Sequence, residues 1–333
     1  MKICHIGCGN LAFSAYRPSY IRCAAEDPDL QLAAACDIDL ARAADFCRQT
    51  GYCQAYADYR TMIRQERPDG VIVTTPYRHT AAIAGELIDL GLPVLLEKPP
   101  GSNADETRDL IRRAAARAVP NQVAFNRRFM PLVQALRSRL PDTPTGRELL
   151  CLSLSRVNRL EPDFHSTAIH GIDLVSYILR SPYASVEFLY QPAREGIADA
   201  VNILMNCVMQ SGALAQLAFP VDAGVVHERL QYSSPGVSYT LHLPVWSCPD
   251  TPGRLTGYRG GQLICDLSGS DLAADPADLQ FEATNGFYQE ISSFLNHLRR
   301  GQPPAADLAS AEQPVAIAGC LAGRAKAYQC QAE

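Results

Sequence analysis

The chain has 333 residues, of which 47% are hydrophobic and 20% are charged. This ordinary globular composition excludes a collagen, a disordered chain and a coiled-coil rod, and the length predicts two domains. The net charge of -5 lacks the basic excess that binding to a nucleic-acid backbone requires, so no nucleic-acid partner is expected.

Over about the first 120 residues, short apolar runs alternate with helix-like segments, which is typical of a parallel sheet with crossover helices. The predicted strands are Lys2–Ile6, Gln31–Cys36, Gly70–Thr74, Val94–Leu96 and Gln122–Phe125. The predicted helices are Leu11–Ala25, Leu40–Gln49, Tyr59–Gln65, Thr80–Leu90 and Ala104–Ala118. Pro18 is expected to kink or restart the first helix. Asp39 and Ser102 are predicted N-caps, and Gly91 is a predicted C-cap.

Beyond about residue 125, the pattern changes to one strong helix after His165, followed by strand-like runs that are bounded by turn residues. The clearest predicted strands are Ala200–Met209, Ala213–Phe219, Val237–Leu243 and Gly261–Cys265. The predicted closing helices are Phe287–Arg299 and Pro314–Ala327. The sequence therefore predicts an α/β Rossmann domain with a doubly wound parallel sheet over 1–121. An α+β domain with a large, mostly antiparallel open sheet is predicted over 122–333.

Membrane, redox and metal signals are weak. Ala200–Val221 is uncharged and long enough to span a bilayer, but Gln210-Ser211-Gly212 predicts a hairpin turn in its middle, so no membrane segment is expected. The twelve cysteines are scattered without an export signal, which favours a reducing, cytoplasmic setting. Cys4, His5 and Cys8 lack a second cysteine pair at ligand spacing, so no metal site is predicted.

Gly7-Cys8-Gly9-Asn10-Leu11-Ala12 is a G-x-G-x-x-A motif that lies directly between the first predicted strand and helix. Gly7 allows the tight turn, Gly9 lets a pyrophosphate approach the backbone, and Ala12 permits close packing. A glycine-rich turn that binds nothing is the alternative. The position of the motif at the first strand-to-helix turn favours a dinucleotide site.

Asp37 ends the second predicted strand. There a carboxylate can accept hydrogen bonds from both adenosine-ribose hydroxyls and would repel a 2'-phosphate, which favours NAD over NADP. The alternative is a surface aspartate that caps the next helix, a role that Asp39 could also fill.

Glu97 and Lys98 follow the apolar run Val94–Leu96, at the sheet edge where open α/β folds bind ligands. A lysine there can hydrogen-bond a substrate hydroxyl and handle its proton. A solvated Glu-Lys pair before a proline turn is the alternative.

With these motifs, the chain resembles the glucose-fructose oxidoreductase and inositol dehydrogenase family (Gfo/Idh/MocA). The resemblance rests on the glycine motif, on Glu97-Lys98-Pro99, on Thr74-Thr75-Pro76 with His79, and on the run 125–131 that leads into the second domain. It implies hydride transfer between NAD or NADP and a carbon of a sugar, cyclitol or related small molecule. A homodimer or homotetramer through the second-domain sheet is also implied. The implied cofactor-binding residues are Gly7, Gly9, Asn10, Leu11, Ala12, Asp37, Thr74, Thr75, Pro76, His79, Glu97, Lys98 and Asn126.

The resemblance also implies a catalytic role for Lys98 and a second motif on the helix after His165. His170 and Asp173 match that motif, but the family's Asp four residues before the His is Ser166 here. Three explanations stay open: Ser166 is the helix N-cap, Asp163 or His165 supplies the missing polarity, or catalysis is weakened or lost. The predicted buried stripe of this helix is Ile169, Ile172, Val175 and Leu179.

The sequence thus predicts an NAD(P)-dependent dehydrogenase or reductase that acts on CH–OH groups, with NAD favoured over NADP. His170 is predicted to take the hydroxyl proton and Lys98 to hydrogen-bond the same oxygen, although Lys98 could instead be the base. The predicted substrate-binding residues are Lys98, Arg128, Asn158, Arg159, His165, Ser166, His170 and Asp173. Two other functions stay open: a non-catalytic NAD-binding sensor or scaffold, and NAD-dependent elimination of a glycoside.

Overall fold

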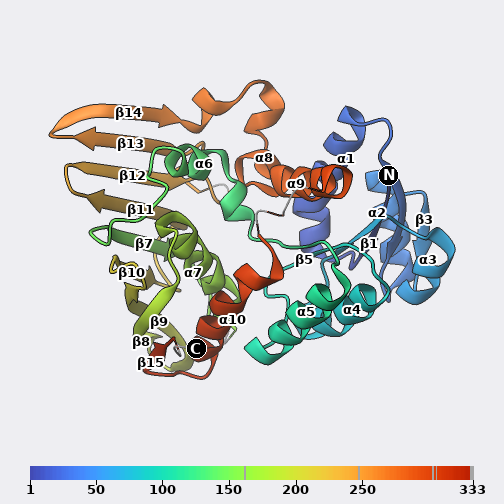
Figure 1. Cartoon of the computed structure of the whole chain (residues 1–333), viewed down its shortest axis with the longest axis horizontal. Coiled ribbons are helices and arrows are strands. Elements are labelled where there is room, and N and C mark those ends of the chain that lie inside the picture. Colours follow the sequence, from blue (N-terminus) through green and yellow to red (C-terminus); the bar gives the residue numbers. More distant parts are fainter. Residues whose placement is uncertain (161–162, 247, 302–303, 305, 331–333) are drawn as a thin grey trace. The chain divides into compact units, whose positions relative to one another are not determined.

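The structure, a computed structural model, describes residues 1–160, 163–246, 248–301, 304 and 306–330 (Figure 1). The chain forms two compact units, Met1–Asn126 with Gly286–Val315, and Arg127–Asn285 with Ala316–Glu333. This differs from the predicted division at residues 121 and 122, because Gly286–Val315 packs with the first unit. One such contact is at Gly70, which has no side chain, so Phe294 and Leu298 of helix α9 (Phe287–Arg300) lie directly against it.

The first unit contains a six-stranded parallel sheet with the strand order β3-β2-β1-β4-β5-β6. Its strands are β1 (Lys2–Ile6), β2 (Gln31–Cys36), β3 (Gln54–Tyr56), β4 (Gly70–Val73), β5 (Val94–Leu96) and β6 (Asn121–Val123). Five of them confirm predicted strands to within two residues. Strand β3 was not predicted, since three residues without a buried side chain give too little hydrophobic periodicity. The strand order is that of a doubly wound Rossmann fold.

Helices connect these strands on both faces of the sheet (Figure 1). They are α1 (Arg17–Glu26), α2 (Leu40–Thr50), α3 (Tyr59–Glu66), α4 (Tyr77–Asp89) and α5 (Ala104–Arg117). A π-helical turn, η1 (Ala12–Tyr16), precedes α1, and Pro18 restarts the helix as predicted. Asp39 caps α2 as predicted, but Asn103 and not Ser102 caps α5. Gly91 follows the α4 C-cap Leu90 with a φ of 77°.

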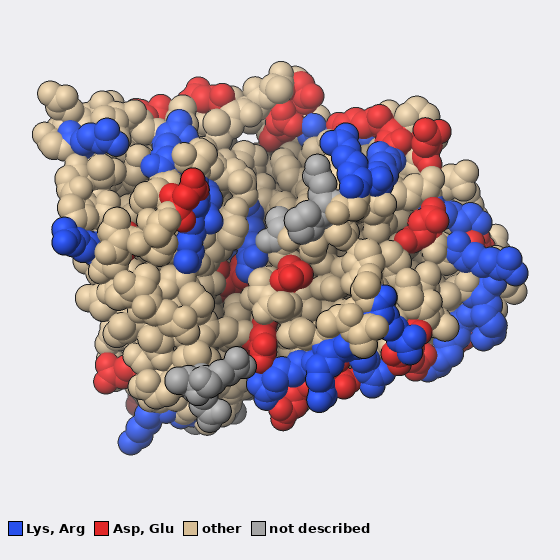
Figure 2. Space-filling model, viewed as in Figure 1, with Lys and Arg blue, Asp and Glu red and all other residues tan. Residues whose placement is uncertain are grey.

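The surface formed by α4 and α5 carries interleaved charges of both signs (Figure 2). Arg113 lies within 2.6 Å of both Asp89 and Asp109, and Arg117 lies 3.2 Å from Asp89. Because these arginines are paired with carboxylates, this surface is not a one-sign basic stripe.

The second unit contains a nine-stranded sheet with the order β14-β13-β12-β11-β7-β10-β9-β8-β15. Its strands are β7 (Leu149–Ser155), β8 (Tyr183–Arg194), β9 (Ile197–Met209), β10 (Leu214–Phe219), β11 (His227–Ser234), β12 (Val237–Leu243), β13 (Arg254–Arg259), β14 (Gln262–Ser268) and β15 (Ala327–Gln329). Neighbouring strands run antiparallel, with the parallel pair β7 and β10 as the exception. The predicted α+β architecture is confirmed, and the predicted turn at 210–212 joins β9 to β10.

Helix α7 (His165–Leu179) packs against β7 and β10 on one face of this sheet (Figure 1). The predicted stripe is buried: Ile169, Ile172 and Val175 are each 0% exposed. Gly171 lets the helix approach closely, since a Cβ there would lie 3.1 Å from Leu154. Short helices α6 (Pro131–Arg137) and α8 (Phe281–Thr284) complete this unit.

The end of the chain departs from its prediction. Helix α10 spans Leu308–Ala322 with Pro314 inside it, whereas the sequence analysis placed a helix over Pro314–Ala327. Proline is common at the first position of a helix, where its missing N–H costs nothing, but here it lies inside one. Residues Ala327–Gln329 pair instead with β8 as the edge strand β15. Among the described residues, none of the helices is both long and apolar enough to span a bilayer.

Candidate functional site

The glycine motif forms a tight turn after β1. Gly7 has a φ of 97°, and a Cβ there would lie 2.9 Å from the backbone of Thr74 and Thr75, so only glycine fits without strain. At Gly9 a Cβ would meet no atom within 4 Å in the described part of the chain. The backbone at Gly9 is therefore accessible, which fits the predicted approach of a pyrophosphate to the start of the first helix.

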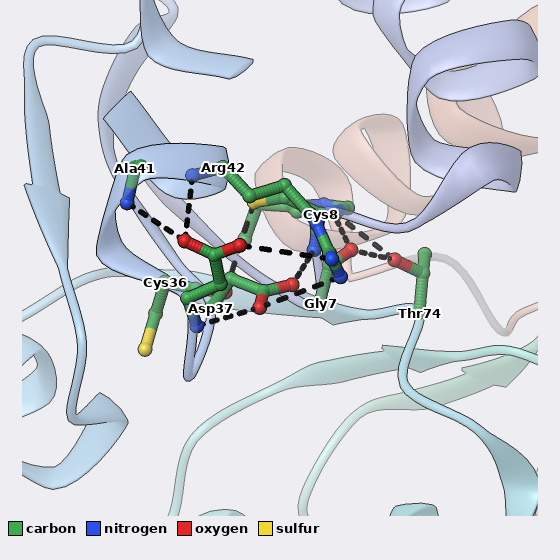
Figure 3. A network of polar contacts seen from close by, with 9 residues as sticks. Gly7, Cys8, Cys36, Asp37, Ala41, Arg42 and Thr74 are labelled. Carbon is green, nitrogen blue, oxygen red and sulfur yellow. Dashed lines mark hydrogen bonds and ion pairs between the residues drawn. The ribbon is translucent and has the colours of Figure 1, made fainter. Parts of the chain in front are cut away.

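Asp37 is tied directly to this turn (Figure 3). Its Oδ2 accepts a hydrogen bond of 2.8 Å from the Cys8 amide, and its Oδ1 accepts one of 3.0 Å from the Asp39 amide. Asp39 takes the capping role, because its Oδ1 accepts from the amides of Ala41 and Arg42. The two aspartates thus have separate partners, and the carboxylate of Asp37 is held at the carboxyl edge of the sheet beside the glycine turn.

The buried side chain of His5, on β1, contacts the glycine turn. Its Nε2 lies 2.9 Å from the carbonyl oxygen of Gly7, and its Nδ1 lies 2.8 Å from the Tyr20 hydroxyl. Burial lowers the pKa of His5 to about 4, so the imidazole is neutral. A carbonyl can only accept, so Nε2–H donates to Gly7 and the Tyr20 hydroxyl donates to Nδ1. From the sequence, His5 was a candidate only for a metal site, because alternation along a strand does not show which loop a side chain will reach.

Glu97 and Lys98 lie at the carboxyl end of β5, as predicted. The Glu97 amide donates to Val73 across the sheet at 2.9 Å. Its side chain is 7% exposed and accepts a hydrogen bond of 2.7 Å from the Tyr16 hydroxyl. The Lys98 amide donates to the other carboxylate oxygen of Glu97 at 3.2 Å. Glu97 is thus a buried, hydrogen-bonded group and not a solvated partner of Lys98, which is half-buried.

The remaining predicted cofactor residues of the first unit lie on two segments. The Thr74 hydroxyl donates to the Gly7 carbonyl, which links β4 to the glycine turn. Thr75 contacts the Thr80 hydroxyl at 3.1 Å, and Pro76 is the N-cap of α4. His79 is exposed on the first turn of α4, whereas Asn126 is 4% exposed at the end of the unit.

On α7, His170 and Ser166 are half-buried and lie on one face, since residues four apart are neighbours on a helix. The N-cap of α7 is Phe164, so the N-cap explanation for Ser166 is wrong; Ser166 lies inside the first turn, where its amide donates to the Asp163 carbonyl at 2.9 Å. Capping of α7 therefore does not explain why this position carries a serine where the family motif has an aspartate.

Asp173 and Arg128, both predicted to bind substrate, pair with each other. Asp173 is 1% exposed and Arg128 is 6% exposed, and Arg128 Nε donates to Asp173 at 2.9 Å. The guanidinium also lies 5.3 Å from the ring centroid of Tyr177. This buried pair anchors α7 one turn beyond His170 to the segment that follows β6.

The other predicted substrate residues lie around the start of α7. Arg159 and His165 line one small hollow together with Phe164 and Arg324. Asn158 is exposed, and its amide donates to Asp222 at 3.3 Å. The structure therefore brings Arg159 and His165 together, while His170 lies on a different face of α7 from His165, five residues away.

A second buried ion cluster was not predicted. Glu228 is 0% exposed and accepts from Arg127 at 2.6 and 2.9 Å and from Arg156. Burial alone would raise the pKa of Glu228, but the two guanidinium groups lower it to about 2. No sequence pattern pairs residues 127, 156 and 228. The pairing of β7 with β11 brings Glu228 opposite Leu154, near Arg156, whereas Arg127 reaches Glu228 from the turn after β6.

Comparison with known proteins agrees with these features. Residues 1–125 match the GFO_IDH_MocA family, which is described as an oxidoreductase family with an NAD-binding Rossmann fold. The chain is 26% identical over 185 residues to inositol 2-dehydrogenase of Mycolicibacterium smegmatis, covering 53% of this chain and 54% of that protein. It is 32% identical over 116 residues to trans-1,2-dihydrobenzene-1,2-diol dehydrogenase of Sus scrofa, covering 35% of each. The chain thus spans only about a third to a half of these relatives.

Solved structures share the fold over nearly the whole length. UDP-N-acetylglucosamine 3-dehydrogenase GnnA from Acidithiobacillus ferrooxidans has a TM-score of 0.80 at 21% identity and covers 98% of each chain. An oxidoreductase from Agrobacterium radiobacter, in complex with NAD+, L-tartaric acid and magnesium, has a TM-score of 0.79 at 16% identity, covering 99% of this chain and 98% of that one. At these identities the similarity establishes the fold of both units.

Proposed function

We propose that this chain, whose residues 1–125 match the Gfo/Idh/MocA oxidoreductase family, is an NAD-dependent dehydrogenase that acts on a CH–OH or carbonyl carbon of a sugar, cyclitol or related small molecule. The observation that carries the proposal is the glycine turn, in which Asp37 accepts from the Cys8 amide while Gly9 leaves the backbone accessible. A turn of this kind suits a dinucleotide, since its amides and helix start favour a pyrophosphate.

The residues that would hold the dinucleotide follow from this turn. Gly9, Asn10, Leu11 and Ala12 would face the pyrophosphate, and Asp37 would accept hydrogen bonds from the adenosine ribose. The preference for NAD over NADP follows from the carboxylate of Asp37, which would repel a 2'-phosphate. Thr74 to Pro76, His79, Glu97 and Asn126 are the further cofactor residues proposed. The bound nicotinamide would supply the hydride chemistry.

Lys98 and His170 are the proposed proton-handling residues. The Lys98 ammonium would donate a hydrogen bond to the substrate oxygen and stabilise negative charge on it, and His170 would take the hydroxyl proton during oxidation. Ser166, Arg159, His165 and Asn158 remain the proposed substrate-side groups. We propose a positioning role for Arg128 and Asp173, supported by their burial against each other.

The chain has only three lysines, Lys2, Lys98 and Lys326, which makes a matched test possible. NADH production is followed on a panel of polyols and sugars for the wild type, Lys98→Met and the control Lys326→Met. Lys98→Met should lower kcat/KM by at least about a hundredfold, which is the low end for a positioned proton-transfer group, with the Kd for NAD unchanged. Retained activity in Lys98→Met would remove this residue from the chemistry.

Ser166 supports a second candidate, an NAD-binding sensor or scaffold, because the position four residues before His170 carries no carboxylate. Tight NAD binding by the wild type without turnover on the whole panel would favour the sensor. Release of a sugar from glycosides without net NADH would instead favour NAD-dependent elimination.

We also propose a homodimer or homotetramer through the face of the second sheet opposite α7. The support is a row of half-exposed apolar side chains in register across three strands, namely Leu149, Leu214 and Val208, which are 48%, 51% and 42% exposed. Leu214→Glu should then shift the mass measured by light scattering to that of a monomer, and an unchanged mass would place the interface elsewhere. A reducing, cytoplasmic setting is proposed as well, supported by twelve free cysteines.

A further inference from the structure

The π-helical turn η1 brings a buried tyrosine to an unusual position in the first unit. Pro18 has no N–H to continue the regular ladder of the helix, and the Arg17 amide donates to the carbonyl of Ala12, five residues back. Tyr16 closes this turn and is 0% exposed. It thus follows the glycine motif by only one helical turn while its ring points into the core.

The Tyr16 hydroxyl begins a short chain of hydrogen bonds that ends at Lys98. It donates to Oε1 of Glu97 at 2.7 Å, and Oε2 of Glu97 accepts from the Lys98 amide at 3.2 Å. Burial next to Glu97 raises the pKa of Tyr16 well above its ordinary value, so the phenol keeps its proton and donates at any working pH. Each carboxylate oxygen of Glu97 thereby has a donor, and its orientation is fixed.

We propose that Tyr16 is a positioning residue that holds Lys98 in its reactive place through the carboxylate of Glu97. The inference deepens the proposed function, on which it rests for the role of Lys98. Without the phenol, Oε1 of Glu97 loses one hydrogen bond, which weakens the constraint on the orientation of the carboxylate. The amide of Lys98 then loses a fixed acceptor, and the lysine loses the constraint on its backbone.

Tyr20 provides a matched comparison. It lies four residues after Tyr16 on the same side of the helix and is also buried, at 1% exposed. Its hydroxyl lies 2.8 Å from His5 Nδ1, and His5 in turn holds the carbonyl of Gly7. The two hydroxyls thus support different parts of the proposed site. Tyr20 supports the glycine turn, and Tyr16 supports Lys98.

The test compares Tyr16→Phe with Tyr20→Phe, since each removes one buried hydroxyl and keeps the ring. Amide hydrogen exchange is measured in the full chain on a peptide spanning 95–101, where Pro99 and Pro100 carry no amide hydrogen and the signal comes from few positions. Exchange in this peptide should be about threefold to tenfold faster in Tyr16→Phe, in line with one lost hydrogen bond. It should be unchanged in Tyr20→Phe.

Kinetics and binding give the second readout. With a substrate from the panel, Tyr16→Phe should lower kcat by about ten- to a hundredfold, the scale for a displaced catalytic group, and leave the Kd for NADH unchanged. Tyr20→Phe should instead raise the Kd for NADH, because its hydroxyl supports the glycine turn through His5. Equal exchange in the 95–101 peptide of both variants, or equal kcat, would overturn the inference. Failure of the wild type to bind any dinucleotide would refute the proposed function instead, and the exchange comparison would still decide the link from Tyr16 to Lys98.

Discussion

The buried imidazole of His5 should make the first unit lose stability as the pH falls. In the folded state His5 is 0% exposed and its pKa is lowered to about 4 by burial, whereas the ordinary value is 6.5. Below about pH 6.5 the unfolded chain therefore binds a proton that the folded chain does not. The free energy of unfolding must fall as the pH falls through this window, and the loss is complete below about pH 4.

The size of the effect follows from the two pKa values. A difference of 2.5 between them corresponds to about 3 kcal/mol at full development, since one unit of pKa is about 1.4 kcal/mol. Between about pH 7.5 and pH 5, linkage gives a loss of about 2 kcal/mol, because at pH 5 the unfolded imidazole is almost fully protonated and the folded one is mostly neutral. His5→Gln keeps a donor toward Gly7 but cannot titrate.

Urea denaturation of the wild type and His5→Gln at the two pH values measures this contribution. Trp246 is the chain's one tryptophan and belongs to the second unit, so its fluorescence reports the unfolding of that unit. Far-UV circular dichroism records the unfolding of both units. A transition that appears in circular dichroism but not in Trp246 fluorescence therefore belongs to the first unit. Comparison of the two proteins removes the contribution of all other titrating groups.

The variant should be less stable than the wild type at pH 7.5, but its first unit should lose about 2 kcal/mol less between pH 7.5 and pH 5. If the two proteins lose equal stability over this range, His5 is not a neutral buried group. The proton assignment that makes it the donor to Gly7 would then be wrong.

Three further changes test other features. Asp37→Ala should lower the ratio of the Kd for NADP to the Kd for NAD, measured by calorimetry, and an unaltered ratio would place the ribose contact elsewhere. The control Asp39→Ala should leave that ratio unchanged and cost about 1 kcal/mol of stability through loss of the α2 cap. Glu228→Gln should destabilise the second unit by about 3 to 5 kcal/mol in denaturation followed by Trp246 fluorescence, because Arg127 and Arg156 lose their buried counter-charge. The control Asp266→Asn, which removes an exposed ion pair, should cost less than about 1 kcal/mol, and equal losses would contradict the buried cluster. Gly7→Ala should lower both the Tm and the affinity for the dinucleotide, because the added Cβ introduces backbone strain of about 1 to 3 kcal/mol. Gly9→Ala should lower only the affinity for the dinucleotide, and a lowered Tm in this variant would show that the surroundings of Gly9 are not open.

Much of the first unit could be predicted from local sequence. The strands β1, β2 and β5 have the predicted bounds, because a fully buried parallel strand is a short apolar run that ends at a turn residue. The glycine motif and Asp37 were identified because their roles depend on backbone conformation and position after a strand. The bounds of the helix predicted over Pro314–Ala327 and the cap predicted at Ser102 were wrong, since a proline or a serine fits more than one place in a helix and packing decides among them.

The partners of the buried polar groups depended on the tertiary structure. Tyr16 and Glu97 are 81 residues apart, and Arg128 and Asp173 are 45 apart, so no local pattern links them. The sequence by itself determined which residues follow each strand, and therefore which polar side chains can lie at the carboxyl edge of the first sheet. The fold decided which of those side chains are held by a neighbour, because a buried charge or hydroxyl must find its partner among whatever groups the packing of distant segments brings within hydrogen-bonding distance.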